Sequence, residues 1–321
     1  MTDTTIPEPP RESPEAIVAA SVLRRSRGRW RMAAFLALAV AVIALAGRFA
    51  LERNGGATDQ IARINIDGTI TTDPARLKVL TDLADDDRVK AVIVAINSPG
   101  GTTAGGEELY EALTALRAKK PVVSVIKERG ASAAYMTAIA SDRIFARRLS
   151  IVGSIGVLYQ NVNAGKLLDT IGVSMEKVAT GPLKAEPDFT GPIKPEVRAS
   201  LQSLIDDSFD WFVDVVSERR GLSRAETLAL ADGRIVTGRQ GIENKLIDAV
   251  GGEAEAIAWL ESEKGVAEKL PVSTRYPLPD QGFNFIGKIL GSEARSALGL
   301  NPTGPIVLDG LVSLWQVGPA S

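Results

Sequence analysis

The decapeptide Ile126–Tyr135, IKERGASAAY, joins the end of an apolar run to a series of small residues. The run itself, PVVSVI at residues 121–126, is typical of a strand that is covered on both faces. The small residues after Gly130 predict the start of a helix. Because α/β enzymes often display a nucleophilic serine at such a junction, Ser132 is a candidate. A serine hydroxyl is a weak nucleophile without a base beside it, so the stretch raises the question of which group accepts its proton.

The surrounding chain alternates between predicted strands and helices. Residues 61–70 (IARINIDGTI) alternate as in a strand, and residues 91–96 (AVIVAI) form a second buried strand. Helical patterns follow them at residues 73–90 and 104–120, and a longer amphipathic helix is predicted from about Pro195 to Arg220. This alternation predicts an α/β fold with a largely parallel sheet and helical crossovers.

The composition is that of a globular protein, with 45% hydrophobic and 24% charged residues among 321. The formal net charge of −2 implies no polyanionic partner, so we expect no nucleic-acid binding. The chain contains no cysteine and no histidine, which excludes disulfides, thiol catalysis and Cys-type zinc sites. A transition-metal site would need carboxylates alone, and the sequence shows no such cluster. We therefore expect neither a metal nor another cofactor.

The N-terminal part differs from the rest. Residues 1–31 are rich in Pro, Glu and Arg and predict a disordered basic tail. Residues 32–51 begin with the apolar run MAAFLALAVAVIALAG and predict a transmembrane anchor, although the run is shorter than the roughly 20 residues that are usual. The arginines before it predict a cytoplasmic N-terminus. A cleaved signal peptide is the alternative, because residues 44–46 resemble a cleavage site, but the long leader favours a retained anchor.

The remaining chain divides into three predicted parts. Residues 52–60 (ERNGGATDQ) predict a flexible linker, residues 61–270 the catalytic domain, and residues 271–321 a tail to which we assign no structure or role.

Three glycine-containing turns follow predicted strands. NSPGG at residues 97–101 could direct backbone N–H groups at a ligand, as in an oxyanion hole, or it could be an ordinary loop. Ser132 could be a nucleophile at a helix start or a plain N-cap. Ser154, in IVGSIGVL at residues 151–158, could be a structural serine in a tight turn. The GxSxG pattern of a nucleophile elbow is not satisfied, because Ala134 stands at the second glycine position.

Without histidine, the base would be a carboxylate or a neutral lysine. A carboxylate is a weak base for a serine proton, whereas lysine can serve where burial favours its neutral form. Lys184, in ATGPLKAEP at residues 179–187, lies in an apolar and conformationally restricted turn. The alternatives are Lys166 and Lys177, which we expect at exposed helix or strand-edge positions, and Lys194, which we expect at a helix start.

Five motifs occur in one order: AINSPGG, GASAAYMTAIASDRIFA, GSIGV, TGPLK and ADGRIVTGRQGIENKLIDAVGG. Together they resemble the signal peptide peptidase A family (SppA, peptidase family S49), in its half-length bacterial form with an N-terminal anchor. The resemblance covers residues 60–260, approximately, and implies a Clp-protease/crotonase-like α/β fold. It implies a serine endopeptidase with Ser132 as nucleophile and Lys184 as general base. Ser154 would orient the lysine, and the N–H groups of Gly101 and Ala133 would form the oxyanion hole.

The resemblance also implies substrates, partners and a location. Members of this family cleave leftover signal peptides and misfolded exported proteins. A half-length chain is expected to form homo-oligomers in which Ser132 of one copy meets Lys184 of another. The catalytic domain would lie on the periplasmic side of a bacterial inner membrane, with its single anchor in the lipid. The chain departs from the family at Ala133-Ala134, where Gly-Gly is usual; this narrows the neighbouring pocket but keeps both N–H groups.

Two other functions are compatible with the same fold. A crotonase-type acyl-CoA enzyme would use the same oxyanion turns, but the predicted anchor argues against it, and the sequence shows no obvious cluster for the CoA phosphates. A non-catalytic membrane scaffold would keep the protease fold, and the Ala-Ala departure makes it slightly more plausible. The set of motifs as a whole favours the peptidase.

Overall fold

The computed structural model describes residues 32–44, 58–277 and 312–314. The chain divides into two compact units, Met1–Thr58 and Asp59–Ser321. In the first unit a helix covers residues 32–44, and none of the helices within the described ranges is long and apolar enough to cross a membrane. The predicted basic tail at residues 1–31 and residues 45–51 of the predicted anchor lie outside the described residues. The membrane span therefore stays a prediction.

The second unit is built on one sheet of nine described strands. They are β1 (Gln60–Ile70), β2 (Val89–Thr102), β3 (Val122–Ala131), β4 (Arg143–Ala146), β5 (Ile151–Gly153), β6 (Ile235–Thr237), β7 (Ala249–Val250), β8 (Val272–Tyr276) and β9 (Val312–Leu314). The strand order is β6-β5-β3-β2-β1-β8, while β4 pairs with β3 and β7, and β9 pairs with β2. All pairs are parallel except β2–β9 and β5–β6. The predicted α/β class and largely parallel sheet are thereby confirmed.

Several helices of this unit begin or end at a local sequence signal. They are α2 (Pro74–Asp85), α3 (Thr103–Arg117), α4 (Ala133–Ile139), α5 (Gly165–Thr170), α6 (Pro195–Arg220), α7 (Arg224–Leu230), α8 (Gly238–Glu243) and α9 (Glu253–Lys264). Asp73 caps α2 by accepting from two backbone N–H groups. Pro195 begins α6 and Gly221, with φ of 61°, ends it, which confirms the predicted bounds of this helix.

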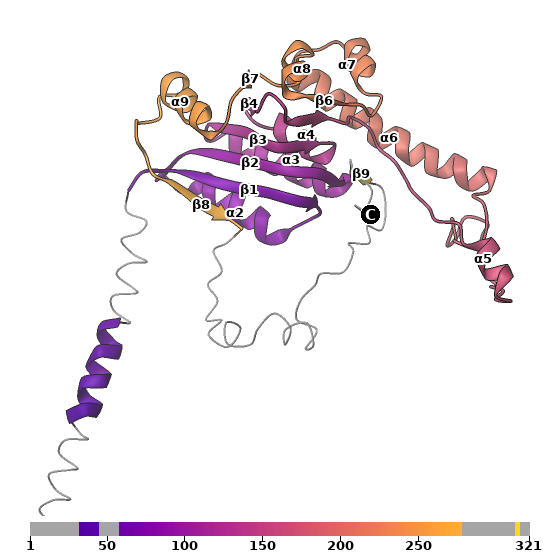
Figure 1. Ribbon diagram of the computed structural model, residues 1–321, viewed down its shortest axis with the longest axis horizontal. Coiled ribbons are helices and arrows are strands. Elements are labelled where there is room, and N and C mark those ends of the chain that lie inside the picture. Colours follow the sequence, from indigo (N-terminus) through magenta and orange to yellow (C-terminus); the bar gives the residue numbers. More distant parts are fainter. Residues whose placement is uncertain (1–31, 45–57, 278–311, 315–321) are drawn as a thin grey trace, which may run out of the picture. The chain divides into compact units, whose positions relative to one another are not determined.

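Both faces of the central strands are buried. On β2, Val92, Val94 and Ile96 pack in a cluster with α2, α3, α4 and α6, while Ala91 and Ile93 pack in a second cluster with α9. Because side chains alternate between the faces of a strand, a strand covered twice needs an unbroken apolar run. Burial of each large aliphatic side chain contributes about 1.5–3 kcal/mol. Figure 1 shows this long strand between β1 and β3, at the centre of the unit.

Two strands come from residues 271–321, where we predict no element. β8 lies parallel to β1, and Arg63 on β1 donates to Thr274 of β8 and to Glu253 of α9. β9 pairs antiparallel with residues 100–102 of β2. β9 therefore lies at the end of β2 where the predicted oxyanion turn is found.

Candidate active site

Ser132 lies at the junction between β3 and α4. Its backbone has φ of 60° and ψ of −124°, a conformation that costs a residue with a side chain about 1–3 kcal/mol. Its N–H donates to the carbonyl of Gly153 at 2.8 Å, and its carbonyl accepts from the N–H of Met136 at 3.0 Å. The side chain makes no capping hydrogen bond to α4, so the residue is not a plain N-cap. A strained strand-to-helix turn of this kind is the geometry of a nucleophile elbow.

Close packing explains the small residues around Ser132. Ala133 and Ala134 are fully buried beneath α3. A Cβ atom on Gly106 of α3 would lie 3.0 Å from the Cβ of Ala133 and 2.9 Å from the Sδ of Met136. Gly106 therefore makes room for the methyl group of Ala133, which accommodates the departure from the Gly-Gly pattern.

Ser154 lies beside Ser132 because of strand register. β3 and β5 are parallel and Ala131 pairs with Gly153, so the next residue on each strand is a serine. Ser154 also has a positive φ, 52°, and its N–H donates to the carbonyl of Arg234 at 2.7 Å. The structure thus brings the two predicted serines to the same corner of the sheet.

Gly101 lies on β2, the neighbour of β3 on its other side. It pairs with Ile70 of β1, and a Cβ atom on Gly101 would lie 1.8 Å from the carbonyl oxygen of Ile70, so no side chain fits. Ser98 holds the preceding turn, because its Oγ accepts from the N–H of Gly100 at 3.1 Å. Since Ser98 also pairs with β3, the register places Gly101 at the same sheet edge as Ser132.

Backbone N–H groups at this corner of the sheet can stabilise negative charge on a carbonyl oxygen. The N–H of Ala133 belongs to the first turn of α4, where N–H groups have no partner within the helix. Together with the N–H of Gly101 it gives two donors near Ser132, which is what an oxyanion hole requires. The three strands β2, β3 and β5 meet here at their carboxyl ends, the edge at which α/β sheets form ligand sites.

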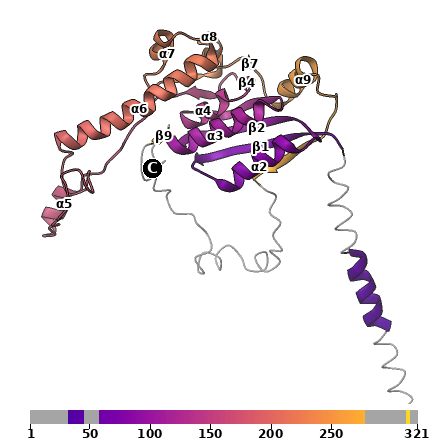
Figure 2. The ribbon, with the colours of Figure 1, turned by 180° about the vertical axis from the view of Figure 1, so that it is seen from behind.

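Lys184 does not lie in this corner. It belongs to residues 157–194, here called the arm, which connect β5 to α6. In Figures 1 and 2 the arm runs from the sheet to α5, which lies at the end of α6 that points away from the sheet. The segment that carries Lys184 is tied to the start of α5, because the N–H of Ala164 donates to the carbonyl of Phe189. Its exposed large apolar side chains are Leu158, Val162, Leu167, Ile171, Val173, Met175, Val178, Leu183 and Phe189. A single chain therefore holds Ser132 and Lys184 apart.

A cluster of charged residues braces the arm. Lys177 contacts Glu186 at 2.7 Å and Asp188 at 3.0 Å. Lys194 also contacts Glu186, at 3.2 Å. Hydrogen bonds from Thr190 and Lys177 hold the pKa of Asp188 at about 2. The hydrogen bond from Lys177 likewise keeps the pKa of Glu186 below its usual range. These contacts engage Lys177 and Lys194, two of the alternative bases.

Lys184 itself is exposed, and its ammonium makes no hydrogen bond or ion pair with any residue that the structure describes. The next residue, Ala185, has a positive φ of 59°. Lys166, the remaining alternative, is exposed on α5. The arm thus presents Lys184 on a braced turn, next to the exposed apolar side chain of Leu183.

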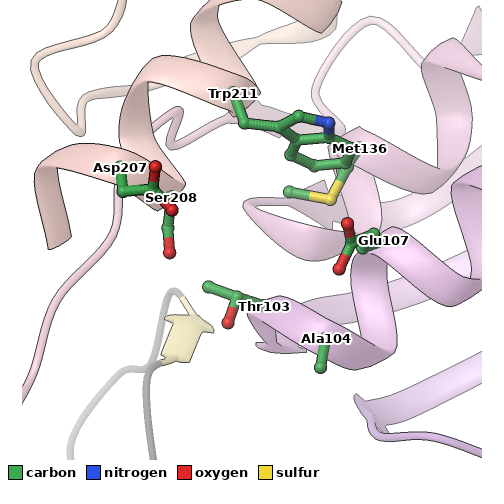
Figure 3. A pocket seen from close by; sticks show the side chains of 7 residues that line it. All are labelled: Thr103, Ala104, Glu107, Met136, Asp207, Ser208 and Trp211. Carbon is green, nitrogen blue, oxygen red and sulfur yellow. The ribbon is translucent and has the colours of Figure 1, made fainter. Parts of the chain in front are cut away.

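A cavity of about 280 Å³ lies beside Met136, in the first turn of α4 (Figure 3). It is lined by residues from three helices: Thr103, Ala104 and Glu107 of α3, Met136 of α4, and Asp207, Ser208 and Trp211 of α6. None of these residues is among those predicted from the sequence. The one available signal in the sequence is Trp211, a large aromatic residue within the amphipathic helix predicted from about Pro195 to Arg220.

Sequence comparisons find relatives of this chain. Residues 114–267 match the family described as peptidase family S49. A candidate protease of Synechocystis sp., slr0021, is 37% identical over 209 residues, which are 64% of this chain and 75% of that protein. A candidate signal peptide peptidase SppA of Enterococcus faecium is 32% identical over 244 residues, 75% of this chain and 68% of that protein. The chloroplastic serine protease SPPA of Arabidopsis thaliana is 26% identical over 271 residues, 82% of this chain but 39% of that protein.

Among solved structures, a ClpP1 mutant from Listeria monocytogenes is similar, with a TM-score of 0.41 and 14% sequence identity. The alignment covers 60% of this chain and 92% of that one. The α/β class rests on the sheet order and register, and the closer Clp-protease/crotonase-like assignment stays a prediction.

Proposed function

This chain belongs to peptidase family S49 and is a serine protease, and we propose that it is a membrane-anchored endopeptidase whose Ser–Lys dyad is shared between copies. In this proposal Ser132 is the nucleophile and Lys184 the general base. Ser154 orients the lysine, and the N–H groups of Gly101 and Ala133 form the oxyanion hole. The observation that carries the proposal is the strained turn at Ser132 beside two other glycine turns, in a chain without histidine.

The proposed reaction uses only groups of the protein. The Oγ of Ser132 attacks the peptide carbonyl, and the amine of Lys184 takes the hydroxyl proton and passes it to the leaving amine. Negative charge on the carbonyl oxygen is stabilised by the preset N–H groups of Gly101 and Ala133. Water then hydrolyses the acyl-enzyme, with the same lysine as base.

The position of the arm supports a shared site. Within one chain the arm keeps Lys184 away from Ser132, and its apolar side chains are exposed. Contiguous exposed apolar surface marks an interaction site in soluble domains. If the arm of one copy docks at the sheet corner of the next, this surface is covered and Lys184 reaches Ser132. The same burial would remove water from the lysine and favour its neutral, proton-accepting form.

We further propose a substrate class and a location. The substrates are residual signal peptides and unfolded segments of exported proteins, in keeping with the name of the Enterococcus faecium relative. The location is a bacterial inner membrane, with the catalytic domain on the periplasmic side. Support for it comes from the apolar run that begins at Met32 and from the arginines that precede it.

The dyad is tested with the full-length chain in detergent and an internally quenched apolar peptide. We expect Ser132→Ala and Lys184→Ala each to lower kcat/KM by about 10³-fold or more, with the oligomer intact by light scattering. The matched control is Lys166→Ala, another exposed lysine of the arm, which should keep the wild-type rate. A Lys184→Ala enzyme that keeps its rate would show that the base is elsewhere. Cleavage that survives in Ser132→Ala would refute the nucleophile.

A further inference from the structure

The cavity between α3, α4 and α6 is next to the elements that carry the proposed nucleophile, Ser132, and the proposed oxyanion donor, Gly101. The reaction proposed above does not use this cavity. Met136, in its wall, lies one helical turn after Ser132 and donates its N–H to the carbonyl of that serine. Thr103 and Glu107, in the opposite wall, belong to the helix that begins directly after the turn of Gly101. A side chain of a peptide bound at the nucleophile can therefore reach the cavity.

The pairing of β9 shows which edge of β2 faces Ser132 and the cavity. β9 pairs antiparallel with residues 100–102 of β2, while β1 occupies the other edge of β2 at this point through Ile70 and Gly101. Since a strand has only two edges, β9 lies on the edge that faces β3 and Ser132. Figure 3 shows β9 at the rim of the cavity near Thr103. A peptide that adds to this edge as a strand, in the place of β9, passes both Ser132 and the cavity.

The lining combines carboxylates with apolar surface. Glu107 and Asp207 lie on opposite sides of the cavity in Figure 3, and Trp211 and Met136 form the wall between them. Neither carboxylate makes a hydrogen bond or ion pair within the described part of the chain. Trp211 is held by an edge-on contact with Tyr110, at 5.9 Å between ring centroids.

A long basic side chain matches this lining. Its methylene groups can pack on Met136, and its cation can approach the ring of Trp211 and the two carboxylates. Glu107 and Asp207 are both exposed, so they stay hydrated when a neutral side chain binds and give it no added attraction, whereas a glutamate side chain would be repelled. We propose that the cavity is a specificity pocket for a lysine or arginine side chain of the peptide substrate. This inference rests on the proposed function and narrows its substrate class to peptides that join a basic residue to apolar ones, as signal peptides do.

The test uses internally quenched peptides of one apolar sequence in which a single lysine is moved through the positions around the cleaved bond. A matched series carries norleucine, which keeps the methylene stem but lacks the charge. With the full-length chain we expect kcat/KM to be about tenfold higher for lysine than for norleucine at one position only. Glutamate at that position should be cleaved more slowly than norleucine, and added salt should reduce the lysine preference.

Two variants decide the role of the carboxylates. In the double variant Glu107→Gln, Asp207→Asn, the lysine preference should fall below about twofold, because kcat/KM for the lysine peptide falls toward the value for the norleucine peptide. The matched control is Glu111→Gln, because Glu111 is an exposed acid one turn further along α3; it should keep the full preference. A lysine preference that persists in the double variant overturns the inference, as does equal cleavage of both series by the wild-type chain.

Failure of the proposed function is distinguishable from failure of the pocket. If the neutral peptide is cleaved but lysine brings no gain, only the pocket is refuted. If no peptide is cleaved, the proposed endopeptidase function with this substrate class fails, and binding tests the pocket separately. Fluorescence anisotropy with Ser132→Ala should then give a Kd about tenfold lower for the lysine peptide than for the norleucine peptide. Equal Kd values there overturn the inference.

Discussion

At the scale of residues, the proposed site gathers backbone conformations that side chains rarely adopt. Ser132 and Ser154 have φ of 60° and 52°, and Ala185, next to Lys184, has φ of 59°. Strain of this kind persists only where the surrounding structure enforces it, and it is frequent at active sites. The small residues of the sequence indicate where Ser132 lies. They do not reveal its conformation, because that depends on the register between β3 and β5 and on the carbonyl of Gly153.

The strain at Ser132 can be measured as stability. Glycine adopts positive φ without steric cost, whereas alanine keeps the strain of the native serine. Both Ser132→Gly and Ser132→Ala should be inactive, but the glycine variant should unfold with a free energy about 1 kcal/mol higher than the alanine variant. Urea denaturation of the two variants measures this difference. Equal stability, or a less stable glycine variant, would show that the turn is not strained.

Gly101 should be irreplaceable for a steric reason. An alanine Cβ would lie 1.8 Å from the carbonyl oxygen of Ile70, so β1 and β2 would have to separate. We expect Gly101→Ala to lose about 3 kcal/mol or more of unfolding free energy, and its activity with it. Gly191→Ala is the matched control, because a Cβ atom there meets no atom within 4 Å. Urea denaturation curves of both variants measure the free energy of unfolding. A Gly101→Ala protein of wild-type stability would contradict the structure.

At the scale of elements, the strands and helices that local patterns specify are the ones that sequence predicts well. β2 and β3 have unbroken apolar runs because both of their faces are covered, and α6 carries its stop signal in Gly221. β8 and β9 are not predicted from the sequence, because short strands like these are determined by pairing with strands that are distant in the chain. The position of the arm is not predicted either, because no local pattern in residues 157–194 indicates how far they extend from the sheet.

The charged cluster of the arm should control activity through the turn that carries Lys184. In Lys177→Met, Glu186 and Asp188 lose a shared partner, so the turn should loosen and kcat/KM should fall at least about tenfold, while Tm changes little because the arm is outside the core. Lys166→Met is the control, since that lysine is not part of the cluster. Wild-type activity in Lys177→Met would show that the cluster does not position the turn.

The same cluster predicts a pH response. The pKa of Asp188 is lowered from 3.8 to about 2, so its contacts stabilise the arm above pH 3.8 and are lost as the pH falls through about 2. In Lys177→Met the pKa of Asp188 should rise toward 3.8, because one of the two main donors is gone while Thr190 remains. Carboxyl NMR titration measures it. A pKa that stays at about 2 would assign the shift to Thr190 alone.

At the scale of the whole molecule, the order of the motifs identifies the family, and the family implies both dyad residues. The sequence does not supply the distance between them, because in one chain α4, which follows Ser132, lies at the sheet, while α5 of the arm lies at the far end of α6. The specificity pocket cannot be predicted from the sequence for a similar reason. Its lining comes from α3, α4 and α6, which only the packed structure brings together. Both features depend on contacts between elements that are distant in the chain.

Subunit mixing tests the shared site most directly. Ser132→Ala and Lys184→Ala proteins are each expected to be inactive, since every site lacks one member of the dyad. After dissociation and reassembly at equal amounts, about a quarter of the wild-type activity should return, because random assembly joins an intact serine to an intact lysine at one interface in four. Mixed oligomers, verified by native mass spectrometry, that remain as inactive as their components would contradict a dyad shared between copies.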